Sequence, residues 1–139
     1  LIIGVKQTSL RRGEFIESVR VPVLDSPQEF LKVGSRSAMV ISVTSLALIT
    51  YPETRSVGIG LGAVNPTPTR AKEAEAYITD YLDWENMQVD PSGLDHFKDL
   101  VSAASNPIDD HRSVAAYRRK SIGILAQRAL TRVFAEGVL

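Results

Sequence analysis

The spacing of the apolar residues changes period near Val64, and this change limits the fold more than any other feature of the chain. Before Val64, apolar and polar residues alternate with the two-residue period of strands. After it, apolar residues recur every three or four positions, as on one face of a helix. Strands followed by helices, without alternation of the two, are typical of an α+β fold rather than a doubly wound α/β fold.

The strand half predicts an antiparallel sheet of three to four strands. We expect strands over residues 14–23, 28–34, 39–50 and 57–64. The third is apolar on both sides, which favours a central position in the sheet. The turn at residues 51–54 carries Pro52 at its second position, and it should join the last two strands as an antiparallel hairpin.

The helix half predicts three helices, each with its own capping signal. The expected caps are, in order, Thr67 with Pro68, Ser92 with Asp95, and Asp109 or Asp110, with Pro107 ending the second helix. The third helix is the longest, and its apolar stripe consists of Val114, Tyr117, Ser121, Leu125, Ala129 and Val133. Packing these helices on one face of the sheet gives a two-layer sandwich.

The charges balance globally but not locally. Sixteen Lys and Arg residues oppose sixteen Asp and Glu residues, which argues against nucleic acid or an anionic membrane as a partner. No segment has the length or apolarity of a membrane span, and cysteine is absent, which fits a cytoplasmic location. Residues 72–110 are acidic and residues 112–136 are basic. Either these regions attract each other within one fold, or one of them is a docking surface.

Gly58, Gly60 and Gly62 match the letters of a dinucleotide-binding loop, but their surroundings do not fit one. The glycines alternate with apolar residues as part of a strand, two prolines precede the next helix, and no acidic residue closes a following strand. Three glycines on one strand face instead predict close packing against another backbone or helix. We therefore expect Gly60→Val to overpack that contact.

No catalytic or metal-binding group emerges from the remaining residues. His111 stands beside Asp109 and Asp110, but acidic residues there are expected for capping a helix. His96 is the other histidine, and no third ligand has a suitable spacing for a metal. The serines lack the sequence around a nucleophile elbow. The residues alone thus predict a domain without an active site.

A series of short motifs nevertheless resembles one known family. The motifs are residues 10–16 (LRRGEFI) with 21–22 (VP), 30–36 (FLKVGSR), 68–71 (PTRA) with 74–75 (AE), 109–112 (DDHR) with 117–118 (YR), and 128–130 (RAL). Their order and spacing resemble the C-terminal domain of the carbon monoxide dehydrogenase medium-subunit family, which includes the FAD subunit of xanthine dehydrogenase. The resemblance extends from about residue 8 to residue 135.

The resemblance implies a sheet of three or four strands followed by three helices, in a subunit that binds FAD. In such enzymes FAD receives electrons from 2Fe-2S iron–sulfur clusters after a molybdopterin centre has oxidised the substrate. The expected partners are the preceding FAD-binding domain and the iron–sulfur and molybdopterin subunits. Residues 1–13 would connect to that preceding domain, and residues 14–139 would form the C-terminal domain. A start at Leu1 rather than Met agrees with a piece of a longer protein.

Two residues are expected near the flavin from the resemblance, namely Lys32 and, less directly, Arg36. Where the family often has an aspartate, this chain has Met39-Val40-Ile41, so no polar contact to the flavin is expected there. Tyr117 and Arg118 also match, as a core tyrosine and a local ion-pair partner. The alternative is a non-catalytic α+β interaction or ligand-binding module. Glycine-rich FAD loops in the sequence preceding Leu1 would distinguish the two.

Overall fold

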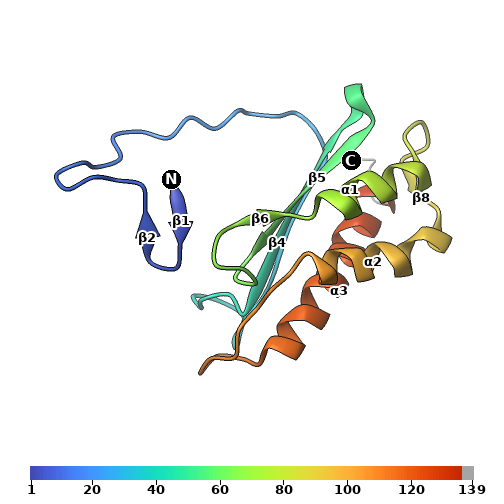
Figure 1. Cartoon of the computed structure of the whole chain (residues 1–139). Coiled ribbons are helices and arrows are strands. Elements are labelled where there is room, and N and C mark those ends of the chain that lie inside the picture. Colours follow the sequence, from blue (N-terminus) through green and yellow to red (C-terminus); the bar gives the residue numbers. More distant parts are fainter. Residues whose placement is uncertain (136–139) are drawn as a thin grey trace.

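The computed structural model describes residues 1–135, and their main feature is a four-stranded antiparallel sheet with helices on one face (Figure 1). The strands lie in the order β3 (Gln28–Val33), β4 (Thr44–Tyr51), β5 (Ser56–Gly62) and β6 (Thr69–Arg70). The helices of this layer are α1 (Lys72–Ile78), α2 (Leu94–Ala103) and α3 (Ala115–Ala135). The predicted α+β sandwich of two layers is confirmed for the described residues.

Shorter elements surround this sandwich. They are the hairpin of β1 (Ile2–Gly4) and β2 (Gln7–Thr8), the hairpin of β7 (Leu82–Asp83) and β8 (Gln88–Val89), and the 3-10 turns η1 (Pro52–Thr54), η2 (Thr79–Tyr81) and η3 (Pro91–Gly93). The β4–β5 hairpin turns through η1, as predicted from Pro52. Among the described residues, no helix combines the length and the apolarity needed to span a bilayer.

Alternation along β4 decides which face of the sheet is covered. Leu46 and Leu48 are buried against the helices, whereas Ala47 and Tyr51 lie on the opposite face and are exposed. The strand is central, as predicted, because β3 and β5 flank it. The side of β4 opposite the helices is uncovered, since the structure has a single helical layer (Figure 1). The strand also begins at Thr44 instead of Met39, and Met39 lies in the preceding loop with a φ of 49°.

The predicted strand over residues 14–23 is absent from the structure. This segment is extended but pairs with no strand, and its apolar side chains are exposed, Phe15 at 81% and Val23 at 99%. It links the β1–β2 hairpin to β3, and most of it lies apart from the sandwich (Figure 1). The alternating pattern was the right signal for an extended chain. A strand also needs a partner, which residues 1–135 do not supply.

Two predicted helix starts are displaced for local reasons. Thr69 and Arg70 pair with Leu61 and Gly60 as β6, so α1 begins at Lys72 instead of Pro68. The predicted cap Ser92 lies instead in the 3-10 turn η3, where the Asp90 carboxylate accepts from the Ser92 amide at 2.9 Å, and α2 itself has no side-chain cap. A 3-10 turn then precedes the helix, which ends at Ala103, ahead of Pro107.

The third helix begins at Ala115, later than a cap at Asp109 or Asp110 predicts, because Asp110 and Ser113 first form an isolated β-bridge. The carboxylate of Asp109 accepts a hydrogen bond from the Ala115 amide, which satisfies one of the free donors at the helix N-terminus. The later part of the predicted stripe, from Ser121 to Val133, is buried. Val114, which precedes the helix, and Tyr117 are exposed, so the expectation of a core tyrosine at Tyr117 is wrong.

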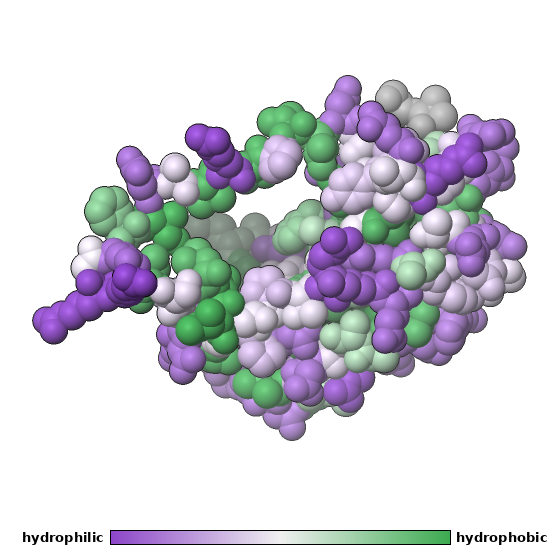
Figure 2. Space-filling model, turned by 45° about the horizontal axis from the view of Figure 1, so that its top comes forward, coloured by the Kyte–Doolittle hydropathy of each residue, from purple (hydrophilic) through white to green (hydrophobic). Residues whose placement is uncertain are grey.

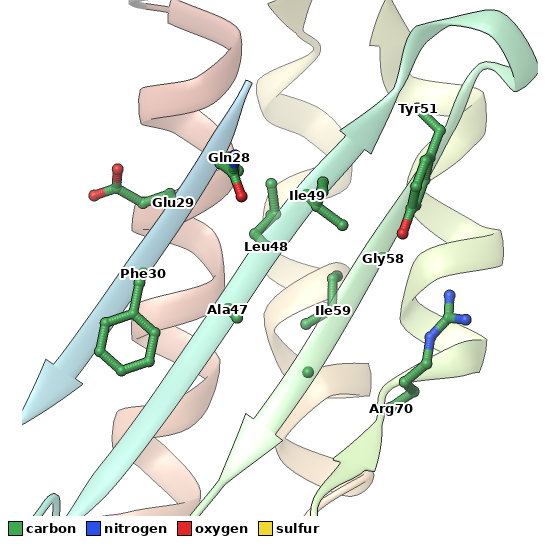
Figure 3. A pocket seen from close by; sticks show the side chains of 11 residues that line it. Gln28, Glu29, Phe30, Ala47, Leu48, Ile49, Tyr51, Gly58, Ile59 and Arg70 are labelled. Atoms are coloured by element: carbon green, nitrogen blue, oxygen red, sulfur yellow. The ribbon is translucent and has the colours of Figure 1, made fainter. Parts of the chain in front are cut away.

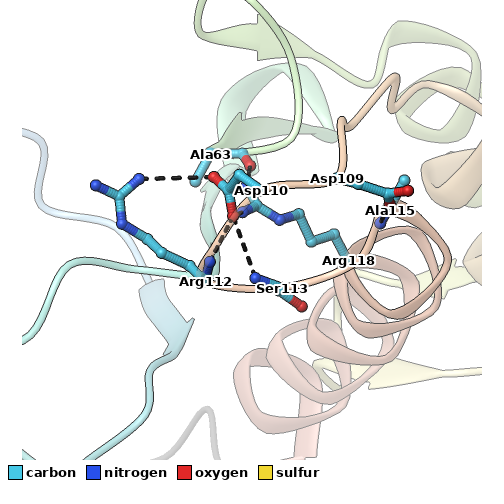
Figure 4. A network of polar contacts seen from close by, with 7 residues as sticks. All are labelled: Ala63, Asp109, Asp110, Arg112, Ser113, Ala115 and Arg118. Atoms are coloured by element: carbon cyan, nitrogen blue, oxygen red, sulfur yellow. Dashed lines mark hydrogen bonds and ion pairs between the residues drawn. The ribbon is translucent and has the colours of Figure 1, made fainter.

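Asp110 and Arg118 join the start of α3 to the end of β5 (Figure 4). Arg118, only 5% exposed, donates to the Ala63 carbonyl at 3.1 Å and to the Asp110 carboxylate. Asp110 also accepts from the backbone amides of Arg112 and Ser113. The Arg112 amide and the Arg118 guanidinium lower the pKa of Asp110 to about 2. This network confirms the expected local ion pair of Arg118 and fixes the loop before α3.

Gly123 allows α2 and α3 to pack closely. A Cβ atom built on Gly123 would lie 2.7 Å from the Lys98 carbonyl oxygen and would also meet the Ser102 hydroxyl. A Cβ on Gly60, in contrast, would meet only the Ala47 carbonyl oxygen, at 4.0 Å. The prediction of close packing at Gly60 is therefore wrong, since this glycine lies on the uncovered face of the sheet.

We expect Gly123→Ala to destabilise the protein and Gly60→Ala to leave its stability almost unchanged. Alanine favours a helix by about 1 kcal/mol over glycine, but the clash with the α2 backbone should cost about 1 to 3 kcal/mol more than that. Thermal and urea unfolding of the two variants measures the difference. Equal unfolding midpoints for Gly123→Ala and the parent chain would contradict the packing described here.

We expect Asp110→Asn to make the stability of the protein less dependent on pH between about pH 4 and pH 2. Because folding lowers the pKa of Asp110, its charged form contributes stability above its ordinary pKa of 3.8, and this contribution is lost as the pH falls toward 2. The difference in unfolding midpoint between parent and variant should therefore shrink on acidification. Asp99→Asn, at an exposed acid on α2, is the control and should show no such change.

Candidate functional site

The uncovered face of the sheet is the candidate site (Figure 3). Pairing places Phe30 opposite Ala47, and Ala47 opposite Gly60. Phe30 is 64% exposed although it lies within a strand, and its ring stands over this face. A flat floor of glycine and alanine beside an exposed aromatic ring favours contact with a flat apolar group.

A groove of about 400 Å³ crosses this face. Its walls are formed by Phe30 on β3, Tyr51 on β4 and Arg70 on β6, and its floor includes Gly58 and Gly60. A Cβ on Gly58 would lie 3.1 Å from Ile49 and 3.3 Å from the Tyr51 ring, so these two side chains lean over the glycine. Gly58 is thus covered by these two side chains, whereas Gly60 lies open on the floor of the groove.

Arg70 is held in place by Glu75. The Glu75 carboxylate accepts from Arg70 Nε at 3.0 Å and from Arg70 Nη2 at 2.6 Å, and Glu75 Oε1 also accepts from the Ile59 amide at 2.8 Å. The hydrogen bond to Glu75 raises the pKa of Arg70. The Arg70 side chain remains 56% exposed, so its other N–H groups are available to a carbonyl or anionic group in the groove.

Lys32 lies on the same face, next to Phe30 along β3. Its ammonium donates to the Val40 carbonyl at 3.3 Å, and pairing sets it opposite Ser45. Arg36, in the loop after β3, donates to the Met39 carbonyl. The structure thus brings both predicted residues to the β3–β4 loop, where they bind adjacent carbonyls. Met39 itself is exposed, and no polar side chain stands at residues 39–41.

The other residues considered from the sequence do not assemble into a catalytic site. Gly58, Gly60 and Gly62 belong to β5, as predicted when the dinucleotide loop was rejected. His96 packs edge-on against Tyr77, with ring centroids 4.7 Å apart. His111 is exposed beside the Asp110 network. Within residues 1–135, no group of three or more potential metal ligands comes together.

Sequence reasoning missed the roles of Glu75, Arg70 and Tyr51. Arg70 and Glu75 were recognised only as letters of a motif, and their spacing of five residues across a helix start gave no sign of a bidentate pair. A glutamate among the alanines of a short amphipathic helix was the available signal, because a charge on the covered face must have a partner. Tyr51 was assigned to a turn, but it ends β4 and borders the groove.

Two relatives match almost the whole chain. The glyceraldehyde dehydrogenase medium chain of Sulfolobus acidocaldarius is 30% identical over 136 residues, with 94% of this chain and 45% of that relative covered. The carbon monoxide dehydrogenase medium chain of Afipia carboxidovorans is 27% identical, with 93% and 44% covered. The chain therefore spans less than half the length of these relatives.

A solved structure and a family model agree with these relatives. Quinoline 2-oxidoreductase from Pseudomonas putida 86 superposes with a TM-score of 0.79 at 20% identity, covering 99% of this chain and 47% of the other, which supports the fold. The model of the CO dehydrogenase flavoprotein C-terminal domain matches residues 29–133, which is most of the chain. The chain thus belongs to the CO dehydrogenase flavoprotein C-terminal domain family.

Proposed function

We propose that this chain is the C-terminal domain of the FAD-binding subunit of a molybdopterin-dependent dehydrogenase or hydroxylase of the xanthine or carbon monoxide dehydrogenase type. The domain alone is non-catalytic. The full subunit would work in the cytoplasm with iron–sulfur and molybdopterin subunits. Family membership supports this role, and the observation that carries it is the uncovered sheet face, which is apolar, flat and bordered by Lys32 and Arg70.

The residues of this face fit one side of a flavin. Gly60 and Ala47 present no side chain larger than a methyl group, so a planar ring system can approach the sheet there. Phe30 offers an aromatic contact, and Lys32 and Arg70 offer donors to carbonyl groups. When bound, FAD would supply the electron relay between the iron–sulfur clusters and the acceptor.

The described residues do not fit the diphosphate of FAD. A diphosphate requires backbone amides at a glycine-rich turn that opens a helix. In residues 1–135 the helices open at Lys72, Leu94 and Ala115, and none of these starts follows such a turn. The phosphates would therefore be held by the part of the subunit that the longer relatives carry in addition, while this domain covers one side of the flavin.

Lys32 is the residue of this domain that we assign to the flavin. One of its three ammonium protons is used on the Val40 carbonyl, which orients the side chain and leaves two donors for another acceptor. A cation beside a flavin stabilises the negative charge that develops on reduction. Arg36 is bound to Met39 in the same loop and would support Lys32 by holding the loop in place.

We expect Lys32→Ala in the full-length subunit to lower the flavin reduction potential or the FAD occupancy without altering the fold. Lys32 is exposed, so its truncation should cost the folded domain little. Lys120→Ala, which removes an exposed charge on α3, is the matched control. Spectroelectrochemical titration and the ratio of flavin to protein absorbance measure the effect. Parent values in Lys32→Ala would remove Lys32 from the flavin site.

The isolated chain should fold but bind no flavin tightly, since one lysine and an open groove cannot replace the contacts to a diphosphate. Purified residues 1–139 should therefore be colourless, and FAD fluorescence should remain unquenched on titration with the protein at micromolar concentration. Stoichiometric FAD that remains bound through gel filtration would contradict the assignment of the phosphate contacts to another part of the subunit.

A further inference from the structure

The N-terminal arm, residues 1–27, exposes an unusual amount of apolar surface. Its exposed apolar side chains are Leu1, Ile2, Ile3, Val5, Leu10, Phe15, Ile16, Val19, Val21, Val23 and Leu24. In Figure 2 these residues form green stretches along the arm, and an opening separates the arm from the sandwich. So many large exposed apolar side chains are rare in a folded chain, and they usually mark a surface that another protein surface covers.

The sandwich does not depend on the arm. All residues of the buried apolar cluster lie between Leu46 and Phe134, and the partly buried residues packed on them begin at Leu31. The arm is attached at its root, where the Thr50 amide and hydroxyl both donate to the Pro27 carbonyl at 3.0 Å. Within residues 1–135, no backbone–backbone hydrogen bond involves residues 15–26.

The arm lies outside the residues that match the family domain. The family model begins at residue 29, directly after the arm. Quinoline 2-oxidoreductase, in contrast, covers 99% of this chain with a TM-score of 0.79, so the arm is matched together with the sandwich. That solved chain is about twice as long, since the match covers 47% of it. The arm therefore has its counterpart in a longer chain, outside the limits of the family domain.

The sequence of the arm indicates how it would bind. In a strand, odd-numbered residues 15 to 23 direct their side chains to one face, and four of these five are apolar, namely Phe15, Val19, Val21 and Val23. The backbone N–H groups of alternate residues also point to opposite edges. Pro22 removes a donor from the edge of the even-numbered residues, which suits an edge strand paired only through its odd-numbered residues.

We propose that residues 14–23 form an edge strand in a sheet of the subunit portion outside this chain, with Phe15, Val19 and Val21 packed on its apolar core. The proposal rests on the proposed function in that it requires the longer FAD-binding subunit. It also sets the structural start of the C-terminal domain at Gln28, with the arm belonging to the neighbouring unit. The partner is thus a sheet with one free edge and an apolar face.

Amide hydrogen exchange of the full-length subunit and of isolated residues 1–139, resolved by residue with NMR, tests the pairing. In the full-length subunit the amides of Phe15, Glu17, Val19 and Val21 should exchange on the order of 100-fold more slowly than in the isolated chain. The amides of Ile16, Ser18 and Arg20 should exchange fast in both, because they face the edge with Pro22. Equal exchange of all seven amides in the two proteins would overturn the proposal.

A pair of matched variants tests the packing face. Val19→Asp places a charge on the apolar face, and Ser18→Asp places the same charge on the opposite face one residue away. In the full-length subunit Val19→Asp should abolish the slow exchange, while Ser18→Asp should preserve it. In isolated residues 1–139 neither variant should shift the unfolding midpoint, since both positions are exposed there. Identical effects of the two variants would overturn the proposed orientation of the strand.

The same measurements separate this proposal from the proposed function. A full-length protein without bound FAD but with protected odd-numbered amides would refute the flavin role and retain the strand. A subunit that contains flavin but has an unprotected arm would retain the flavin role and refute the edge strand. Protection already present in isolated residues 1–139, together with a dimer in gel filtration, would identify a second copy as the occupant and overturn the proposal.

Discussion

Burial of the sheet on one side only is the constraint on which the rest of this structure depends. A single helical layer can cover one face of four strands, so every strand must alternate between residues for the helices and residues for the opposite face. Leu46, Leu48 and Ile59 are buried on the face that the helices cover. Ala47 and Gly60 lie on the opposite face and leave the backbone open. The groove and the core are thus consequences of one pattern.

The two layers are joined by polar contacts as well as apolar ones. Glu75 on α1 accepts from the Ile59 amide within β5 and from Arg70 on β6, so a helix carboxylate connects two strands. Arg118 on α3 reaches the Ala63 carbonyl just after β5. Both contacts lie at the edge of the sheet formed by β5 and β6. This edge has few residues for apolar packing, since β6 has two residues. Buried polar groups there fix the position of each helix.

The order of the elements and the layer architecture were predictable from the change of period near Val64. The cap at Asp109 was also predictable, because a short polar side chain before an apolar stripe has one common role. The displaced start of α1 was not, since Pro68 is equally suitable before a helix and before a short edge strand. Pairing with Gly60 decides between them, and that contact spans ten residues of sequence.

The candidate site was predictable only in part. Lys32 and Arg36 came from a resemblance, and the structure brings both to the β3–β4 loop. The groove could not be predicted, because the glycines of β5 are equally compatible with a covered and an open face. Whether the glycine face is covered or open depends on whether a second layer of helices is present to cover it. The acidic and basic regions were expected either to attract each other or to serve as a docking surface. Among the described residues, the ion pairs between them join Asp110 to Arg112 and Arg118.

The exposed segment at residues 14–23 has a consequence for how such a domain is made. A β-branched, extended segment with free backbone groups pairs readily with copies of itself, and this is the usual start of aggregation. Glu17, Arg20 and Pro22 are the residues that oppose such self-pairing here. In the isolated chain this segment stays in water after the core at residues 46–134 has formed. The tendency of the isolated chain to self-associate therefore depends on a segment that lies outside its core.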